Sequence, residues 1–216
     1  MKEEEEGIKK TFKVIFIGDE SVGKTAIINK FVKETFDEDT QSTVGADLLS
    51  KEVKLDNESV KICIWDTGGQ KRYYDLLPIY FKSSKGCFIV YDISNKETFK
   101  NLGDRFEKVY KMAENGEEYE PNVKIILVGN KCDLEKDREV TKEEGQELAN
   151  QMKCPFFETS ARNDVNIDQI FECMAKEINE SYDEDEKRKE AKAIKLDENR
   201  NKRIQDEAKA EYYTCI

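Results

Sequence analysis

Short apolar runs alternate with amphipathic stretches along most of the chain. The runs are rich in β-branched and aromatic residues at consecutive positions, which is typical of strands buried on both faces of a sheet. One pair of runs is separated by a turn at Asp56-Asn57, as expected of a hairpin. The pattern predicts buried strands at 12–17, 87–91, 123–128 and 154–157, and a hairpin of 48–55 and 60–65.

Apolar residues recur at helical spacing between these runs. They predict helices near 24–34, 97–113, 141–152 and 167–179. Strands that alternate with helices form a mostly parallel sheet covered by helices on each side. We therefore expect an α/β fold with a doubly wound, six-stranded, mostly parallel sheet and helices on both faces.

Length and composition divide the chain into a folded domain and two polar ends. A chain of 216 residues is long enough for one domain with a tail. Large apolar residues become scarce after residue 181, and such a segment cannot bury enough apolar surface to fold alone. We expect a flexible acidic N-terminus at 1–10, a domain at 11–180 and a charged tail at 181–216 that is helical or disordered.

Charge and residue usage exclude several function classes. The net charge is −11, which disfavours nucleic acid as a partner because phosphate contacts need an excess of Lys and Arg. The chain contains no His, which excludes Ser-His and Cys-His nucleophiles and His-ligated metals. The six cysteines form no C-x-x-C pair, and no signal peptide or membrane-spanning run is visible. We expect a cytoplasmic monomer.

A phosphate-binding motif follows the first predicted strand. It fits the pattern G-x4-G-K-[ST] between a strand and a helix, which is the context that the motif requires. Its glycines let backbone N–H groups surround a phosphate at the positive end of the helix dipole. Lys24 can reach the outer phosphates, and the Thr25 hydroxyl can bind Mg²⁺. The motif reads Gly18-Asp19-Glu20-Ser21-Val22-Gly23-Lys24-Thr25.

A second motif follows the strand that ends at Trp65. A carboxylate at this place, Asp66, can hold Mg²⁺ through a water molecule. The N–H of Gly69 can meet a terminal phosphate, and Gln70 can orient a hydrolytic water because its amide both donates and accepts. The motif reads Asp66-Thr67-Gly68-Gly69-Gln70.

A third motif, Asn130-Lys131-Cys132-Asp133, follows another predicted strand. One carboxylate can accept two hydrogen bonds from guanine, whereas adenine offers neither donor there, so Asp133 can select guanine. Asn130 can tie this loop to the phosphate loop, and the stem of Lys131 can pack on the base. After the last strand, the backbone N–H of Ala161 can meet the guanine carbonyl.

These motifs together resemble the Ras superfamily of small GTPases, and most closely the Rab family. The resemblance covers about residues 11–180. Trp65 before Asp66, and Val90-Tyr91-Asp92 after the fourth strand, are more similar to Rab than to Ras or Rho relatives. The matching segments, in family order, are the phosphate loop, 41–47, 64–70, 130–133 and 158–161.

The resemblance implies a P-loop NTPase G domain that binds GTP or GDP with Mg²⁺ and hydrolyses GTP slowly. Such a protein is a molecular switch that recruits effectors in vesicle traffic. Its expected partners are a guanine-nucleotide exchange factor, a GTPase-activating protein and effectors. The γ-phosphate holds two switch segments, a first one around Thr43 and a second one that includes Gly69 and Gln70, and hydrolysis releases them.

The resemblance also implies roles for individual residues. Gln70 would be catalytic, and Thr25, Thr43 and Asp66 would bind the metal. The implied nucleotide-binding residues are Gly18, Glu20, Ser21, Val22, Gly23, Lys24, Thr25, Ala26, Phe36, Thr43, Gly69, Asn130, Lys131, Asp133, Ser160, Ala161 and Arg162.

Several positions depart from the family pattern. Glu20 occupies a position that is usually small, so its carboxylate would repel the γ-phosphate, crowd Gln70 and slow hydrolysis. Gly68 replaces the usual Ala and should loosen the second switch. A binding scaffold locked with GTP is the alternative function that these departures favour. A metabolite kinase is a further rival, and the 130–133 motif argues against it.

Two further features leave alternatives open. Tyr73, Tyr74 and Tyr80 either form an aromatic patch that faces an effector or are partly buried helix residues. Cys215 is followed by Ile216, without the three residues of a C-a-a-X box. It is either singly prenylated, placing the protein at the cytoplasmic face of an endomembrane, or a free cysteine of a cytosolic protein.

Overall fold

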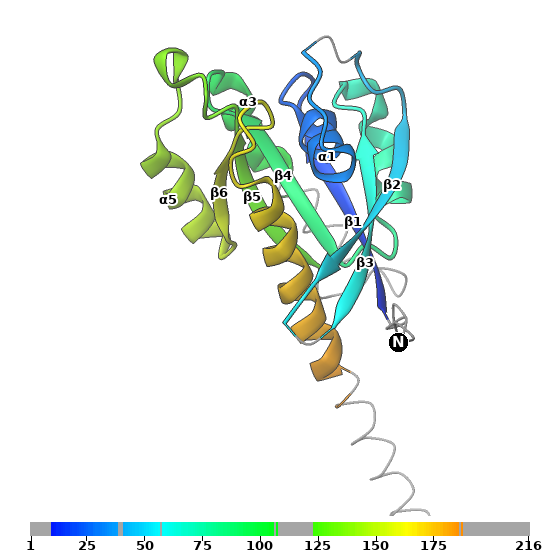
Figure 1. Cartoon of the computed structure of the whole chain (residues 1–216). Helices are drawn as coiled ribbons and strands as arrows, with labels where there is room; N and C mark the ends of the chain where they lie inside the picture. Colours follow the sequence, from blue (N-terminus) through cyan, green and yellow to red (C-terminus); the bar gives the residue numbers. More distant parts are fainter. Residues whose placement is uncertain are drawn as a thin grey trace, which may run out of the picture. The chain divides into compact units, whose positions relative to one another are not determined.

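Six strands form one sheet in the order β2-β3-β1-β4-β5-β6 (Figure 1). The structure, a computed structural model, describes residues 10–38, 41–56, 58–105, 107, 123–185 and 187. The strands are β1 (Lys10–Gly18), β2 (Ala46–Lys54), β3 (Ser59–Thr67), β4 (Gly86–Asp92), β5 (Lys124–Asn130) and β6 (Phe156–Thr159).

Strand pairing is parallel everywhere except in the hairpin of β2 and β3. The predicted doubly wound, mostly parallel six-stranded sheet is therefore confirmed, and so is the predicted hairpin. Register places Phe16 opposite Asp66, Gly18 opposite Val90, and Asn130 opposite both Asp92 and Thr159. The carboxyl ends of the five parallel strands thus share one edge, where an open α/β sheet binds ligands.

Alternate side chains of the central strands enter two separate cores, one on each face of the sheet. In β1, Phe12, Val14 and Phe16 join one cluster, whereas Ile15 and Ile17 join the other. The first cluster includes residues of α1 and of the helical run that begins at residue 167. The second includes residues of α2 and α5. Strands buried on both faces explain why their sequences are apolar at consecutive positions.

Helices cover both faces of the sheet (Figure 1). Three of the four predicted helices are found near their predicted bounds, and the described part of the fourth is divided at Asn101. Pattern alone placed no element at 71–81, where the structure has two short helices. The helices are α1 (Lys24–Lys33), η1 (Lys71–Leu76), α2 (Leu77–Phe81), α3 (Lys96–Lys100), η2 (Glu135–Asp137) and α5 (Lys142–Met152), with further helical residues at 102–105 and 167–185.

Local chemistry fixes some of these ends. Thr141 begins α5 with a capping box, because its side chain accepts from the N–H of Glu144 and the Glu144 side chain accepts from the N–H of Thr141. Pro78 stands in the first turn of α2, where the ring needs no hydrogen-bond donor. The two short helices at 71–81 have only six and five residues. A helical apolar period is hard to detect over so few positions, which explains why the pattern did not predict them.

The chain divides into two compact units, residues 1–178 and 179–216. The predicted ends of the domain, at 10/11 and 180/181, stay predictions, because the structure describes few residues beyond them. Cys215 and most of the predicted tail lie outside the described residues. Within the part that is described, no helix has the length and apolar character needed to cross a membrane.

Replacing Phe171 should destabilise the first core more than any surface change on the same helix. Its ring stacks on Phe31, with centroids 3.6 Å apart, and also contacts Phe16 and Phe88. Phe171→Ala should lower the free energy of unfolding by about 3–5 kcal/mol, measured by urea denaturation. Glu172→Ala, at an exposed position of the same helix, is the control. A loss for Phe171→Ala no larger than that of the control would contradict this packing.

Candidate functional site

The phosphate loop between β1 and α1 leaves the first turn of α1 open to an anion. Gly23 precedes the helix with φ 93°, a left-handed conformation that favours glycine, and α1 has no side-chain cap. A side chain at Gly23 would also lie 2.3 Å from Nδ2 of Asn130. The N–H groups of the first turn therefore remain available for a phosphate at the positive end of the helix.

Lys24 folds back over the loop that precedes it. Its Nζ donates to the carbonyl oxygens of Gly18 at 2.9 Å and of Asp19 at 2.8 Å. The residue is only 6% exposed, and this burial lowers the pKa of Lys24 to about 8. An anion in the adjacent cavity would stabilise the charged ammonium, so the loop is suited to phosphate.

Three oxygen-bearing side chains from separate segments meet behind the loop. Thr25 Oγ1 lies 2.6 Å from Asp66 Oδ2 and 2.8 Å from Thr43 Oγ1, which is itself 3.3 Å from that carboxylate oxygen. Burial raises the pKa of Asp66. Its other oxygen, Oδ1, is buried and has no hydrogen-bond partner among the described residues.

This donor set fits Mg²⁺. The ion prefers hard oxygen ligands, and it would both satisfy the orphaned oxygen of Asp66 and stabilise its buried charge. Magnesium usually takes few protein ligands and completes its shell with water and substrate phosphates. The adjacent phosphate loop is consistent with that arrangement. Thr25, Thr43 and Asp66, the three predicted metal ligands, are thus brought together.

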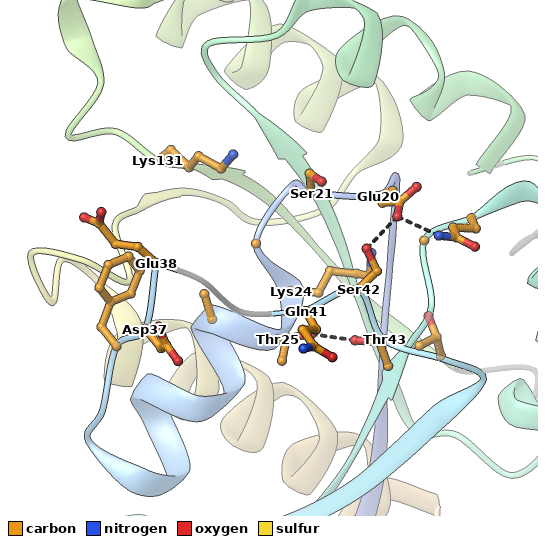
Figure 2. Close-up of a pocket in the computed structure, with 16 residues that line it drawn as sticks. Glu20, Ser21, Lys24, Thr25, Asp37, Glu38, Gln41, Ser42, Thr43 and Lys131 are labelled. Carbon is orange, nitrogen blue, oxygen red and sulfur yellow. Dashed lines mark hydrogen bonds between the residues drawn. The ribbon is translucent and has the colours of Figure 1, made fainter.

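Glu20 contacts both predicted switch segments. Its Oε1 accepts from Ser42 Oγ at 2.6 Å and from Gln70 Nε2 at 2.7 Å, and Figure 2 shows Ser42 pointing toward Glu20 above Lys24 and Thr25. The bond from Gln70, followed by the bond from Ser42, lowers the pKa of Glu20. The carboxylate therefore stays ionised at neutral pH at the phosphate end of the site.

Gly68 and Gly69 allow the second switch to lie close to the first switch and to the phosphate loop. A side chain at Gly69 would meet the peptide between Asp19 and Glu20 at 2.4 Å. One at Gly68 would lie 2.7 Å from the carbonyl oxygen of Thr43, and the Gly68 N–H donates to Gly45 O at 2.8 Å. The expectation that Gly68 loosens the second switch stays a prediction. In this conformation, the absence of a side chain at Gly68 permits close contact with Thr43 of the first switch.

Asn130 connects the phosphate loop with the loop that follows β5. Its Nδ2 donates to the carbonyl of Val22 at 2.9 Å, and its Oδ1 accepts from Thr159 Oγ1 at 3.0 Å. The predicted tie to the phosphate loop is therefore present. Nearby, Lys131 Nζ forms an ion pair with Asp92 at 2.6 Å.

A cavity of about 330 Å³ lies between these loops. Asp133 lines it, and one oxygen of its carboxylate accepts from the Ser160 hydroxyl. Phe36 covers another side, where Arg162 lies with Cζ 5.7 Å from the ring centroid and pairs with Glu38. The lining is Gly23, Ala26, Phe36, Glu38, Asn130, Lys131, Asp133, Leu134, Ala161 and Arg162.

A second cavity, of about 280 Å³, lies at the phosphate end (Figure 2). The two cavities share five lining residues. They therefore form one continuous surface, with Lys24 and the hydroxyls of Thr25 and Thr43 at one end and the Asp133 carboxylate at the other. The lining of the second cavity is Glu20, Ser21, Gly23, Lys24, Thr25, Ala26, Phe36, Asp37, Glu38, Gln41, Ser42, Thr43, Thr67, Gly69, Gln70 and Lys131.

Most of the predicted site residues line these cavities, and four others support them from behind. Gly18 and Val22 contribute carbonyls to Lys24 and Asn130, whereas Asp66 and Ser160 hold Thr25 and Asp133. Sequence reasoning missed the lining residues Asp37, Glu38, Gln41, Ser42, Thr67 and Leu134. Ser42 adjoins Thr43 in a recognised motif, but nothing local marks Glu38, whose partner Arg162 is distant in the chain.

The three tyrosines of the segment that follows Gln70 are all partly buried. Tyr74 is partly buried and its hydroxyl donates toward Asp19, so it does not belong to an outward aromatic patch. The ring of Tyr80 packs beside that of Trp65, with centroids 5.6 Å apart. Tyr73 and Tyr74 lie in η1 and Tyr80 lies in α2, and all three are partly buried, so the alternative of partly buried helix residues is correct for all of them.

Comparison with known proteins gives a match to a family model and similar proteins from other organisms. The model of the Ras family matches residues 13–180. The chain is 38% identical to Ras-related protein Rab-11C of Dictyostelium discoideum over 175 residues, which cover 81% of this chain and 75% of the relative. It is 35% identical to Ras-related protein Rab-13 of Rattus norvegicus over 167 residues, which cover 77% and 79%.

Proposed function

This chain belongs to the Ras family and is a Rab-like small GTPase, a GTP hydrolase of vesicle traffic, and from that premise we propose how its own residues bind GTP, hydrolyse it and signal. The continuity of the two cavities carries the proposal, because a phosphate site and a carboxylate-lined pocket then face the two ends of one ligand. The comparisons do not favour the alternative, a scaffold locked with GTP.

At the phosphate end, Lys24 and the N–H groups of α1 bind the outer phosphates. Thr25, Thr43 and Asp66 would hold Mg²⁺, which would supply charge neutralisation at the phosphate oxygens when bound. Thr43 belongs to the first switch, so its contact with Asp66 and Thr25 closes that segment over the site. Gly69 offers its N–H to the terminal phosphate.

At the other end, the Asp133 carboxylate accepts from the two donors on the edge of guanine. The Ser160 hydroxyl orients that carboxylate, and the N–H of Ala161 meets the guanine carbonyl. Phe36, Lys131 and Arg162 enclose the faces of the base. Adenine would leave a carboxylate without its donors, which is the physical basis of the selectivity.

Gln70 orients the water that attacks the γ-phosphate. In this conformation its amide nitrogen is bound to Glu20, so Glu20 holds the amide of Gln70 and also brings negative charge toward the phosphates. Both effects slow hydrolysis. A GTPase-activating protein would have to release Gln70 from Glu20, which makes this bond a point at which a partner can act.

Effectors and the exchange factor bind where the switches are exposed. Apolar side chains gather there: Leu48 is 56% exposed and Ile79 is 67% exposed. Leu48 lies opposite Trp65 in the hairpin register, and the Trp65 ring packs on Tyr80 next to Ile79. We assign this apolar face to effector recognition, since β2 and α2, which carry its two sides, follow the two switch segments in the chain.

The first test of this function is the nucleotide content of the purified protein and its change in Asp133→Asn. The Asn amide group places an N–H donor where a carboxylate oxygen accepted a hydrogen bond from guanine. The affinity for GDP should therefore fall by about 100-fold or more. Asp137→Asn, the same change at an exposed position of η2, is the control. Competition between guanine and adenine nucleotides provides the measurement. Guanine selectivity equal to that of wild type would contradict the role of Asp133.

Removal of Glu20 should accelerate hydrolysis. Glu20→Ser frees the amide of Gln70 and removes a charge near the γ-phosphate, so the single-turnover rate should rise about three- to tenfold. Ser42→Ala is the matched control, because it removes the other partner of Glu20 and keeps its bond from Gln70. An unchanged rate in Glu20→Ser would show that the carboxylate does not restrain Gln70.

Peripheral attachment to an endomembrane through a lipid on Cys215 completes the proposal. One lipid chain gives weak anchoring, so the protein should exchange between membrane and cytosol. Cys215→Ser should move the protein into the soluble fraction in a membrane-partitioning assay, whereas Thr214→Ala should leave the partitioning unchanged. The same partitioning for Cys215→Ser and wild type would count against lipidation.

A further inference from the structure

The Asp19 carboxylate of the phosphate loop is held by residues from two other segments. Its Oδ1 accepts from the Arg105 guanidinium and from the Tyr74 hydroxyl at 3.1 Å. Its Oδ2 accepts from Asn101 Nδ2 at 2.8 Å. Asp19 lines neither cavity, so this carboxylate faces away from the nucleotide that the site would bind.

The ion pair of Arg105 with Asp19 is largely shielded from solvent. The Arg105 side chain is 7% exposed and that of Asp19 is 17% exposed. A buried charge is costly unless it is paired and hydrogen-bonded, so the pair cannot separate easily. The same guanidinium also contacts Tyr74, donating to its hydroxyl and placing Cζ 4.1 Å from the centroid of its ring.

Tyr74 lies in η1, and its ring packs at the edge of the second core. None of the residues of η1 is buried, and the helix has no side-chain cap. The Tyr74 hydroxyl lies 3.1 Å from the carbonyl oxygen of Gly69 as well as from Asp19. Gly69 itself packs against the peptide that follows Asp19. One hydroxyl therefore links η1, the residue before Gln70 and the phosphate loop.

We propose that Arg105 is a positioning residue that, through Asp19 and Tyr74, adds to the hold of the γ-phosphate on the 69–76 segment and slows the release of this segment after hydrolysis. Every contact in this set joins two protein groups, so loss of the γ-phosphate breaks none of them. The inference rests on the proposed function and deepens it. Gln70 therefore leaves the phosphates more slowly after hydrolysis, and a partner that opens the second switch must displace the Tyr74 hydroxyl.

Hydrogen exchange of the 69–76 segment in full-length protein tests this role. Tyr74→Phe removes the hydroxyl but keeps the ring on Arg105 and the buried ion pair with Asp19, so the fold should be retained. With GDP bound, exchange in this segment should become about tenfold faster than in wild type. With a non-hydrolysable GTP analogue the acceleration should be smaller, because the γ-phosphate also holds Gly69. Tyr73→Phe, one residue away, is the matched control and should exchange like wild type.

A second variant and a kinetic measurement separate positioning from general stability. Arg105→Lys keeps a positive charge beside Asp19 but loses the planar guanidinium that donates to Tyr74. It should therefore reproduce most of the faster exchange seen in Tyr74→Phe. Single-turnover hydrolysis by Tyr74→Phe should slow about threefold, with GTP affinity unchanged, because only the position of Gln70 is affected.

Two outcomes would overturn the inference. Unchanged exchange of 69–76 in GDP-bound Tyr74→Phe would show that the hydroxyl does not hold the segment. Equal acceleration in β5 would show a loss of global stability instead. If wild type binds no guanine nucleotide, the proposed function fails, and the exchange comparison on nucleotide-free protein still tests the contacts of Arg105, Asp19 and Tyr74.

Discussion

The side-chain amide of Asn130 joins the two halves of the site. Its two hydrogen bonds set the distance between the phosphate loop and the loops that follow β5 and β6. Its nitrogen donates to the phosphate loop at Val22, and its oxygen accepts from Thr159 at the end of β6. The amide is buried, so an unmade bond would carry the full cost of desolvation. The absence of a side chain at Gly23 lets the two loops come this close. Phosphate and base pockets are thereby held at a fixed separation.

Two consecutive acids give this phosphate loop its individual character. Asp19 turns away from the cavities toward Arg105 and Tyr74, whereas Glu20 lines the phosphate cavity and binds Gln70. Both acids thus contact the second switch, Glu20 at Gln70 and Asp19 at Tyr74. The arrangement keeps that segment on the phosphate loop and at the same time restrains the residue that orients water. A protein with these contacts is suited to slow hydrolysis that a partner accelerates by rearranging the second switch.

Much of the fold and site could be predicted from the sequence because the relevant signals are local. Strands with two buried faces are apolar at consecutive positions, and this places their ends within a few residues. The glycines and Lys24 of the phosphate loop must lie between one strand and one helix, so spacing reveals them. Asp66 and Asn130 stand at strand ends, and parallel strands bring such ends to one edge. The resemblance to a known family then supplied roles that spacing alone leaves open.

Tertiary structure decided the contacts between residues that are distant in the chain. Asp19 and Tyr74 are 55 positions apart, Asp19 and Arg105 are 86 apart, and Glu38 and Arg162 are 124 apart. The bounds of the short helices at 71–81 were not predicted either, because helices of five or six residues show too little of an apolar period. Local sequence determined which groups this protein carries to the edge of its sheet. Packing determined which of those groups meet, because a hydrogen bond depends on distances of a few ångströms that no spacing along the chain encodes.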